Sequence, residues 1–166
     1  MGNKPLVAFR KSTDQDIPYF KEWLLQPGVL EGFPMTDVRE IDDAIRIWKM
    51  YLKKGTSITA LYKKKPCGAA NLYINEIEKM RHQSLFVIIV DEKVRNQGIG
   101  ALLMKELMQL AKETFHIEIL HLEVYEHNPA YNLYQRMGFE ECGRHSKYLK
   151  GTDGRYFDKI FMQKIL

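Results

Sequence analysis

Three residues in the middle of the chain have the types and spacing of a phosphate-binding turn. Arg95 is followed by Gly98 and Gly100, and glycines, which lack Cβ atoms, let backbone N–H groups approach an anion closely. The turn lies between Leu85–Val90, an apolar run typical of a buried strand, and Ala101–Phe115, whose apolar residues recur at helical spacing. The free N–H groups and the positive dipole end of that helix would then face a phosphate.

Two other nucleotide-binding patterns are absent. A dinucleotide-binding turn requires a third glycine where this chain has Leu103, and the chain has no Walker Gly-Lys-Ser/Thr sequence. A tight turn without a ligand stays open as the simplest alternative. The pattern Arg-x-x-Gly-x-Gly, however, resembles the acyl-CoA pyrophosphate loop of the GNAT superfamily of N-acetyltransferases. The resemblance implies that acetyl-CoA is bound by Arg95, Asn96, Gln97, Gly98, Ile99, Gly100 and Ala101.

A second segment extends this resemblance. Glu118–Tyr125 alternates as a strand does, Asn128 and Pro129 can start a helix, and Gly138 is typical of a helix end. The segment from Asn128 to Gly138 resembles the second cofactor motif of the superfamily. In that family the strand of this motif splays away from the strand before the pyrophosphate loop, and pantetheine lies between them. The resemblance implies that pantetheine pairs with backbone groups near Ile88 and Val90 and that Asn128 completes the cofactor site.

The spacing within the second motif leaves one position open. The family's Asn and Tyr are one residue further apart than Asn128 and Tyr134. An alignment on Tyr134 places His127 at the Asn position instead. The tyrosine assignment is the same in both alignments.

The resemblance implies transfer of an acetyl group from acetyl-CoA to a primary amine by direct attack in a ternary complex. An amine with a pKa near ~10.4 is mostly protonated at pH 7, so a base must remove its proton. Glu123 is the candidate base. The alternative is that Glu123 is an ordinary exposed glutamate of a strand, without a catalytic role. Tyr134 is the candidate acid that protonates the departing thiolate. The alternative is that Tyr134 only packs on a helix face. The N–H group of Val90 is the candidate donor to the oxyanion.

Other residues enter the site as weaker candidates. Some relatives place a carboxylate where this chain has Ser84, so that route is closed, whereas Glu76 and Glu78 could act through water. His121 has the pattern of a structural strand histidine. Aromatic residues could line the acceptor pocket or belong to the core, which is the commoner outcome: Trp23, Phe33, Trp48, Tyr148 and Tyr156, with Pro34 beside them.

Composition limits the classes of protein. The chain has 166 residues, 45% hydrophobic and 28% charged, as in ordinary globular proteins. No run approaches the ~18 apolar residues of a membrane span, and no signal peptide is evident, which favours the cytoplasm and no membrane partner. The net charge of +4 needs no nucleic acid to explain it. Cys67 and Cys142 lack metal spacing and are expected to be free, buried thiols, and no metal is expected.

The pattern predicts one domain, residues 1–166, of mixed α/β class. The resemblance implies a mostly antiparallel twisted sheet of about six or seven strands with about four helices, its two central strands splayed around acyl-CoA. A free edge at the final hairpin would permit a homodimer, although nothing in the sequence demands one. Residues 5–11, 56–62, 67–74, 85–90, 118–125, 140–149 and 156–165 are the expected strands, and 15–25, 37–53, 101–115 and 128–137 the expected helices.

Three functions compete at this point. An acetyl-CoA-dependent N-acetyltransferase acting on a small amine or on a peptide or protein N-terminus is favoured by the turn at Gly98 and by Tyr134. A non-enzymatic acyl-CoA-binding or regulatory module on the same fold is the alternative. A small nucleotide-binding regulator is disfavoured by the missing fingerprints.

Overall fold

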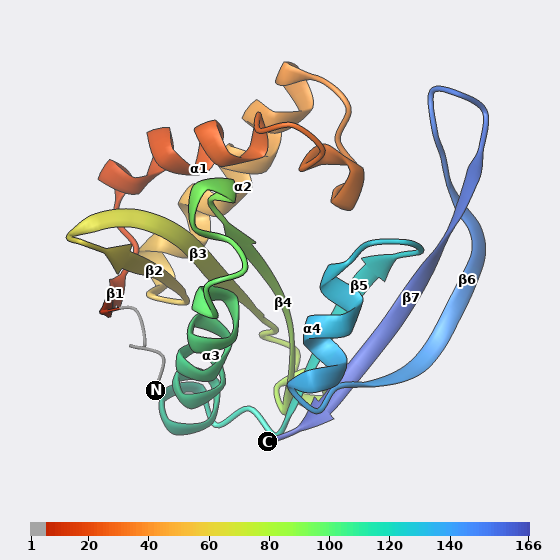
Figure 1. The fold of residues 1–166 in the computed structure, drawn as a ribbon. Coiled ribbons are helices and arrows are strands. Elements are labelled where there is room, and N and C mark those ends of the chain that lie inside the picture. Colours follow the sequence, from red (N-terminus) through yellow and green to blue (C-terminus); the bar gives the residue numbers. More distant parts are fainter. Residues whose placement is uncertain (1–5) are drawn as a thin grey trace.

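The computed structural model describes residues 6–166, in which one sheet carries helices on both faces (Figure 1). Residue 5 of the first expected strand lies outside the described residues. The strands are β1 (Val7–Lys11), β2 (Ser57–Tyr62), β3 (Lys65–Ile74), β4 (Gln83–Val90), β5 (Ile119–Tyr125), β6 (Glu140–Lys150) and β7 (Tyr156–Ile165). The α-helices are α1 (Ile17–Leu24), α2 (Val38–Lys54), α3 (Ile99–Phe115) and α4 (Ala130–Arg136).

The predicted fold class is confirmed. The seven-stranded sheet has the order β1-β2-β3-β4-β5-β7-β6, and its neighbours are antiparallel except for β4 and β5. Predicted element bounds differ from the observed ones by a few residues at most. Helix α3, for example, begins at Ile99 rather than Ala101, because Gly98 with φ +79° is its N-cap.

The parallel pair at the centre of the sheet is very short. β4 and β5 pair only where Gln83–Leu85 lies beside Ile119–His121. Beyond this contact the two strands diverge, while β4 stays paired with β3 and β5 stays paired with β7 (Figure 1). The central strands are therefore splayed, as the resemblance implied.

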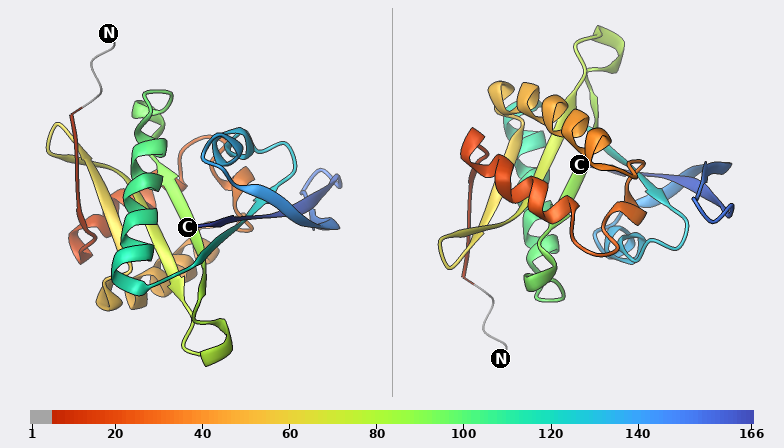
Figure 2. Two further views of the ribbon diagram at one scale, coloured as in Figure 1. Left: turned by 90° about the horizontal axis from the view of Figure 1, so that it is seen from below. Right: turned by 90° about the horizontal axis from the view of Figure 1, so that it is seen from above.

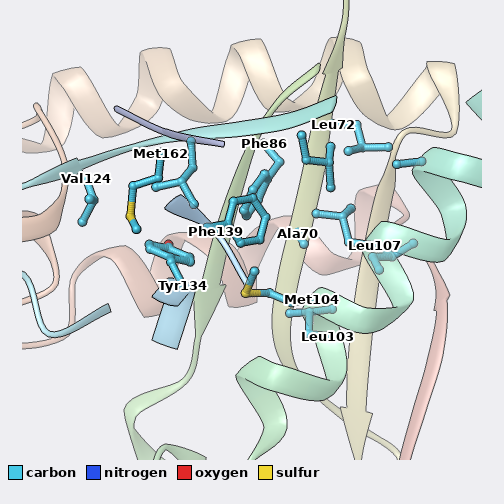
Figure 3. Packing of buried hydrophobic residues seen from close by; sticks show 14 of the residues in the cluster. Ala70, Leu72, Phe86, Leu103, Met104, Leu107, Val124, Tyr134, Phe139 and Met162 are labelled. Atoms are coloured by element: carbon cyan, nitrogen blue, oxygen red, sulfur yellow. The ribbon is translucent and has the colours of Figure 1, made fainter. Parts of the chain in front are cut away.

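The larger hydrophobic core lies between the sheet and the helices α3 and α4. Phe86 of β4, Leu103 and Leu107 of α3, and Tyr134 of α4 belong to one buried cluster, which continues to Met162 of β7 (Figure 3). The same core therefore includes side chains from both sides of the gap that opens where β4 and β5 stop pairing.

A second core lies on the opposite face, under α1 and α2 (Figure 2). Trp23 and Trp48 are almost fully buried in it, and Phe20 stacks on Trp48 with ring centroids 4.4 Å apart. Of the two roles open to these tryptophans, acceptor pocket or core, the core is therefore the one that they have. Because both lie on the inner face of an amphipathic helix, burial against the sheet stabilises them there.

A buried ion pair fixes the start of α1. The Asp16 side chain is 1% exposed, and its carboxylate accepts two hydrogen bonds of 2.7 Å from the guanidinium group of Arg10. It also accepts from the backbone N–H of Thr13 and from the hydroxyl of Thr59, both at 2.9 Å. Burial alone would raise the pKa of Asp16, but the hydrogen bonds from Arg10, Thr13 and Thr59 outweigh it and lower the pKa.

This carboxylate gives the first testable prediction. A lowered pKa means that ionised Asp16 stabilises the fold above about pH 4, and that this contribution is lost as the pH falls through the folded-state pKa. Asp16→Asn is expected to reduce the free energy of unfolding by about 2 kcal/mol at pH 7. Urea unfolding at pH 7 and pH 3.5 measures this, and the difference between variant and wild type should shrink at the lower pH. The exposed Asp153, paired with Arg155, provides a control, since solvent screens this pair and Asp153→Asn should change stability much less than Asp16→Asn does.

The two cysteines differ in their surroundings. Both are free, as predicted, but Cys142 is exposed, so its predicted burial was wrong. It lies on β6, the edge strand, whose side chains face solvent along most of its length. Burial raises the pKa of Cys67 to about 11, which makes this thiol unreactive at neutral pH.

Candidate active site

The N-terminus of α3 presents backbone donors at the wide end of the gap between β4 and β5. Gly98 provides no side-chain cap, so the first N–H groups of a 17-residue helix have no partner within the helix. Asn96 and Gly98 both have positive φ, +60° and +79°, which turns the chain sharply from β4 into the helix. This arrangement can bind an anion such as a pyrophosphate.

Arg95 lies beside this turn. Its Nε donates a hydrogen bond of 3.1 Å to the carbonyl oxygen of Val90. Arg95 is otherwise exposed to solvent. The guanidinium group therefore stands at the junction of β4 and the turn, with further N–H donors free to contact an anion.

Gln26, immediately after α1, clamps the chain ahead of the turn. Its Nε2 donates to Asp91 Oδ1 at 2.7 Å, and its Oε1 accepts from the N–H of Glu92 at 2.9 Å. The carboxylate of Asp91 also accepts from the N–H of Lys93 at 3.0 Å. The sequence does not reveal these contacts, because nothing local indicates a partner 65 residues away.

The backbone of β4 has hydrogen-bonding groups that point into the gap. The N–H of Asp91 donates to the carbonyl of Cys67 in β3, and hydrogen-bonding direction alternates along an antiparallel strand. The N–H and C=O groups of Val90 and Ile88 therefore point away from β3, to the side from which β5 has diverged. These are the two residues predicted to pair with pantetheine.

Helix α4 closes the gap on the side of α3. A Cβ atom at Gly100 would lie 3.3 Å from Leu133 Cδ2 and 3.8 Å from Val90 Cγ2. A Cβ atom there would press on the end of the Leu133 side chain, so glycine lets the first turn of α3 pack closely against α4 without displacing it.

Tyr134 of α4 lies in the same region. Its ring meets Phe86 of β4 and Phe139 nearly edge-on, with centroids 6.2 Å away in both cases (Figure 3). Burial raises the pKa of Tyr134 to about 12. The hydroxyl is therefore protonated at neutral pH, as a proton donor must be.

Glu123 points to the face opposite the α4 core, because its neighbours Leu122 and Val124 are buried in that core. Its side chain is 38% exposed, and its Oε2 is 2.7 Å from the ammonium group of Lys159 on β7. Sequence reasoning missed Lys159, although the alternation along β7 places it on one face with Phe157 and Phe161. Which residue lies opposite it depends on the register between β5 and β7.

The other sequence-based candidates lie elsewhere or have structural partners. Glu76 and Glu78 are on the turn before β4, at the end where β4 and β5 pair, and they form ion pairs with Lys54 and Arg81. The hydroxyl of Ser84 donates to the carbonyl of Leu85 at 2.9 Å.

The segment between β5 and α4 contains both candidates for the second cofactor motif. The Oδ1 of Asn128 accepts from the N–H of Ala130 at 2.9 Å, and the amide group of Asn128 lies against Gly32 of the segment between α1 and α2. His127 has φ +68°. Both residues line a hollow of about 540 Å³. The side chain of Asn128 therefore links the first residue of α4 to the segment between α1 and α2.

Three further observations concern metal ligands, membrane-spanning helices and the aromatic residues predicted at the acceptor pocket. Within residues 6–166, no three His, Cys, Asp or Glu side chains gather as a metal site would require. In the same part of the chain, no helix is long and apolar enough to cross a membrane. Of the aromatic residues expected at the acceptor pocket, Tyr148 lies near Glu123, since its ring contacts Lys159.

Splayed central strands, an uncapped helix N-terminus at their open end and a buried tyrosine on the next helix define a class of acyltransferase folds. The Acetyltransferase (GNAT) family matches residues 17–139. This is well over half of the chain, which therefore belongs to the GNAT acetyltransferase family.

Individual proteins that are similar to this chain are also named as N-acetyltransferases. An L-amino acid N-acetyltransferase of Escherichia coli is 27% identical over 99 residues, which cover 59% of this chain and 60% of that enzyme. An N-alpha-acetyltransferase of Sulfurisphaera tokodaii is 44% identical over 55 residues, 32% of this chain and 33% of that enzyme. The crystal structure of a ribosomal-protein-alanine N-acetyltransferase from Brucella melitensis superimposes with a TM-score of 0.79 at 26% identity and covers 96% of this chain and 99% of that one.

Proposed function

We propose that the protein is an N-acetyltransferase that transfers an acetyl group from acetyl-CoA to a primary amine by direct attack in a ternary complex. The observation that carries this proposal is the uncapped N-terminus of α3 at the open end of the gap between β4 and β5. Membership of the GNAT family supports it.

The residues that hold acetyl-CoA follow from this geometry. The first N–H groups of α3 and the guanidinium group of Arg95 bind the pyrophosphate, and the backbone groups of Ile88 and Val90 that face the gap pair with pantetheine. Asn128 fixes the segment on the far side of the gap through its contact with Gly32. The pyrophosphate site consists of Arg95, Asn96, Gln97, Gly98, Ile99, Gly100 and Ala101.

The acetyl transfer needs a base, an oxyanion donor and an acid. The carboxylate of Glu123 takes a proton from the acceptor amine, whose nitrogen then bonds to the thioester carbonyl carbon. The N–H of Val90 stabilises the oxyanion that develops there. As the carbon–sulfur bond breaks, Tyr134 donates its proton to the thiolate, which leaves as CoA thiol. The acylated nitrogen then loses its second proton, which restores the hydroxyl of Tyr134.

The acceptor is a compound with an α-amino group. The names of the relatives describe acetylation of L-amino acids, of N-alpha groups and of ribosomal-protein alanine. An α-amino group of this kind is an amine on a carbon that also carries a carbonyl or carboxyl group. The acceptor reaches the gap from the Glu123 side of the sheet, because α4 and the larger core close the other side.

Thermal unfolding with saturating acetyl-CoA tests the proposal. At about 100 times the dissociation constant, binding should add about 2.7 kcal/mol and raise the melting temperature by roughly 5–10 °C. ATP and NAD serve as controls and should have no such effect. A panel of amino acids and short peptides, followed by release of CoA thiol, then tests transfer. A shift without release from any amine would favour the non-catalytic acyl-CoA-binding module, and no shift would contradict both functions.

A further inference from the structure

Lys159 of β7 lies on the same face of the sheet as Glu123, and the two form an ion pair of 2.7 Å. In the register of β5 and β7, Lys159 is opposite Tyr125 and Glu123 is opposite Phe161. The two charged residues are therefore diagonal neighbours on adjacent strands. The lysine side chain is 8% exposed and the glutamate side chain 38%, so the pair is buried at its cationic end and open at its anionic end.

Aromatic side chains cover the ammonium group of Lys159. It lies 3.7 Å from the ring centroid of Tyr148, Tyr125 stacks on Tyr148 at 6.4 Å, and His145 meets Tyr148 edge-on at 5.0 Å. The register of β6 is irregular just after His145, and such a bulge changes the direction of the side chains that follow it. Here it lets Tyr148 lie over the lysine and shield its ammonium group from water.

Neighbouring groups determine the charge of this lysine. Burial alone would lower the pKa of Lys159, but its hydrogen bonds to Glu123 and Tyr148 outweigh burial and raise the pKa. Burial lowers the pKa of His121, on the same face of β5, so His121 is neutral at pH 7. Arg144 lies on the opposite face, beside Ile160, and pairs there with three carboxylates: Glu126, Glu141 and Asp158. Lys159 is therefore the charged partner of Glu123 at pH 7.

We propose that Lys159 is the positioning residue of the acceptor site: its ammonium group holds Oε2 of Glu123 and leaves Oε1 to meet the incoming amine. The role rests on the proposed function, in which Glu123 accepts the proton. A carboxylate held at one oxygen has little rotational freedom left to lose when the amine arrives, so proton transfer occurs more often in each bound complex. The same ammonium group neutralises the carboxylate, so a cationic amine binds less tightly than it would to Glu123 alone.

These two effects give Lys159 a kinetic signature that general damage to the fold does not produce. Lys159→Met is expected to lower kcat about tenfold, while KM for the amine stays the same or falls and the affinity for acetyl-CoA is unchanged. Lys159→Arg, which keeps a cation over Tyr148, should recover most of kcat. Lys150→Met is the matched control, because Lys150 is an exposed lysine of the same hairpin whose ammonium group lies over Tyr156 at 5.6 Å. Its kinetics should equal those of the wild type.

A second measurement does not depend on activity. The titration of Lys159 is followed by 13C NMR of its ε-carbon in the wild type and in Glu123→Gln. With the carboxylate replaced, burial is opposed only by Tyr148, so the lysine should lose its proton at a lower pH than it does in the wild type.

The outcomes separate the two proposals. An equal titration in wild type and Glu123→Gln would overturn the positioning role, as would a Lys159→Met variant whose KM rises while kcat is unchanged, or one that Lys159→Arg does not rescue. Absence of turnover in the wild type on every amine would instead contradict the proposed function, and the NMR titration would still decide whether Lys159 holds Glu123.

Discussion

Tyr134→Phe should lower kcat by about 10²–10⁴-fold and leave the dissociation constant for acetyl-CoA nearly unchanged. The substitution removes only the hydroxyl group, which is the proton donor to the thiolate in the proposed reaction. The ring keeps its edge-on contacts with Phe86 and Phe139, so the core at this point stays packed. Steady-state kinetics with thiol detection, together with calorimetric titration of acetyl-CoA, measure the two quantities separately.

A neighbouring tyrosine of the same helix provides the control. The hydroxyl of Tyr131 donates to Glu141 Oε2 at 3.2 Å, outside the gap, so Tyr131→Phe should leave kcat within about twofold of the wild type. Because the pKa of Tyr134 is raised to about 12, its ionisation should cause no loss of activity below about pH 11. Similar losses in both variants, or a loss of acetyl-CoA affinity in Tyr134→Phe, would contradict the assignment.

The second large effect is expected at Gly98. A Cβ atom there would meet no protein atom within 4 Å, so Gly98→Ala places a methyl group in the open space before α3, where the pyrophosphate is proposed to lie. Loss of one hydrogen bond to a charged phosphate corresponds to about 1.5–3 kcal/mol, and hence to about 10–100-fold weaker binding of acetyl-CoA. Calorimetric titration measures this directly.

The chain contains a closely matched control for this substitution. Gly154, in the turn between β6 and β7, has φ +83° against +79° at Gly98, and it too has open space around its missing Cβ atom. Both Gly→Ala variants therefore carry a similar backbone strain of about 1–2 kcal/mol and should lose similar stability. Only Gly98→Ala should lose affinity for acetyl-CoA. Equal affinities in the two variants would mean that the turn at Gly98 holds no pyrophosphate.

The parts of the structure that could be predicted from the sequence depend on local patterns. Gly98, Gly100 and the helical spacing that follows lie within one short segment, so the turn and the helix behind it were predicted within two residues. Gly138, with φ +87°, ends α4 as a left-handed glycine should. The splay of the two central strands came from the resemblance, since pairing between distant strands has no local signal.

The parts that could not be predicted depend on contacts between distant residues. Trp23 and Trp48 had suitable chemistry for an acceptor pocket, but the packing of α1 and α2 on the sheet decides that they are core residues. Lys159 contacts Glu123 only because of the register between β5 and β7. Gln26 reaches Asp91 only because α1 ends above the strand β4. Each of these side chains acquires its role from the tertiary fold.

The short parallel contact between β4 and β5 also affects how the molecule holds together as a cooperative unit. The sheet consists of two hydrogen-bonded blocks, β1 to β4 and β5 with β7 and β6, joined at the backbone over three residues on each strand. What couples the blocks over the rest of their length is side-chain packing, in the buried cluster that runs from Phe86 to Met162. A ligand that pairs with the free edge of β4 and touches α4 would therefore bridge the two blocks and stabilise their association while it is bound. Its binding energy would add to the cooperativity of folding as well as to catalysis.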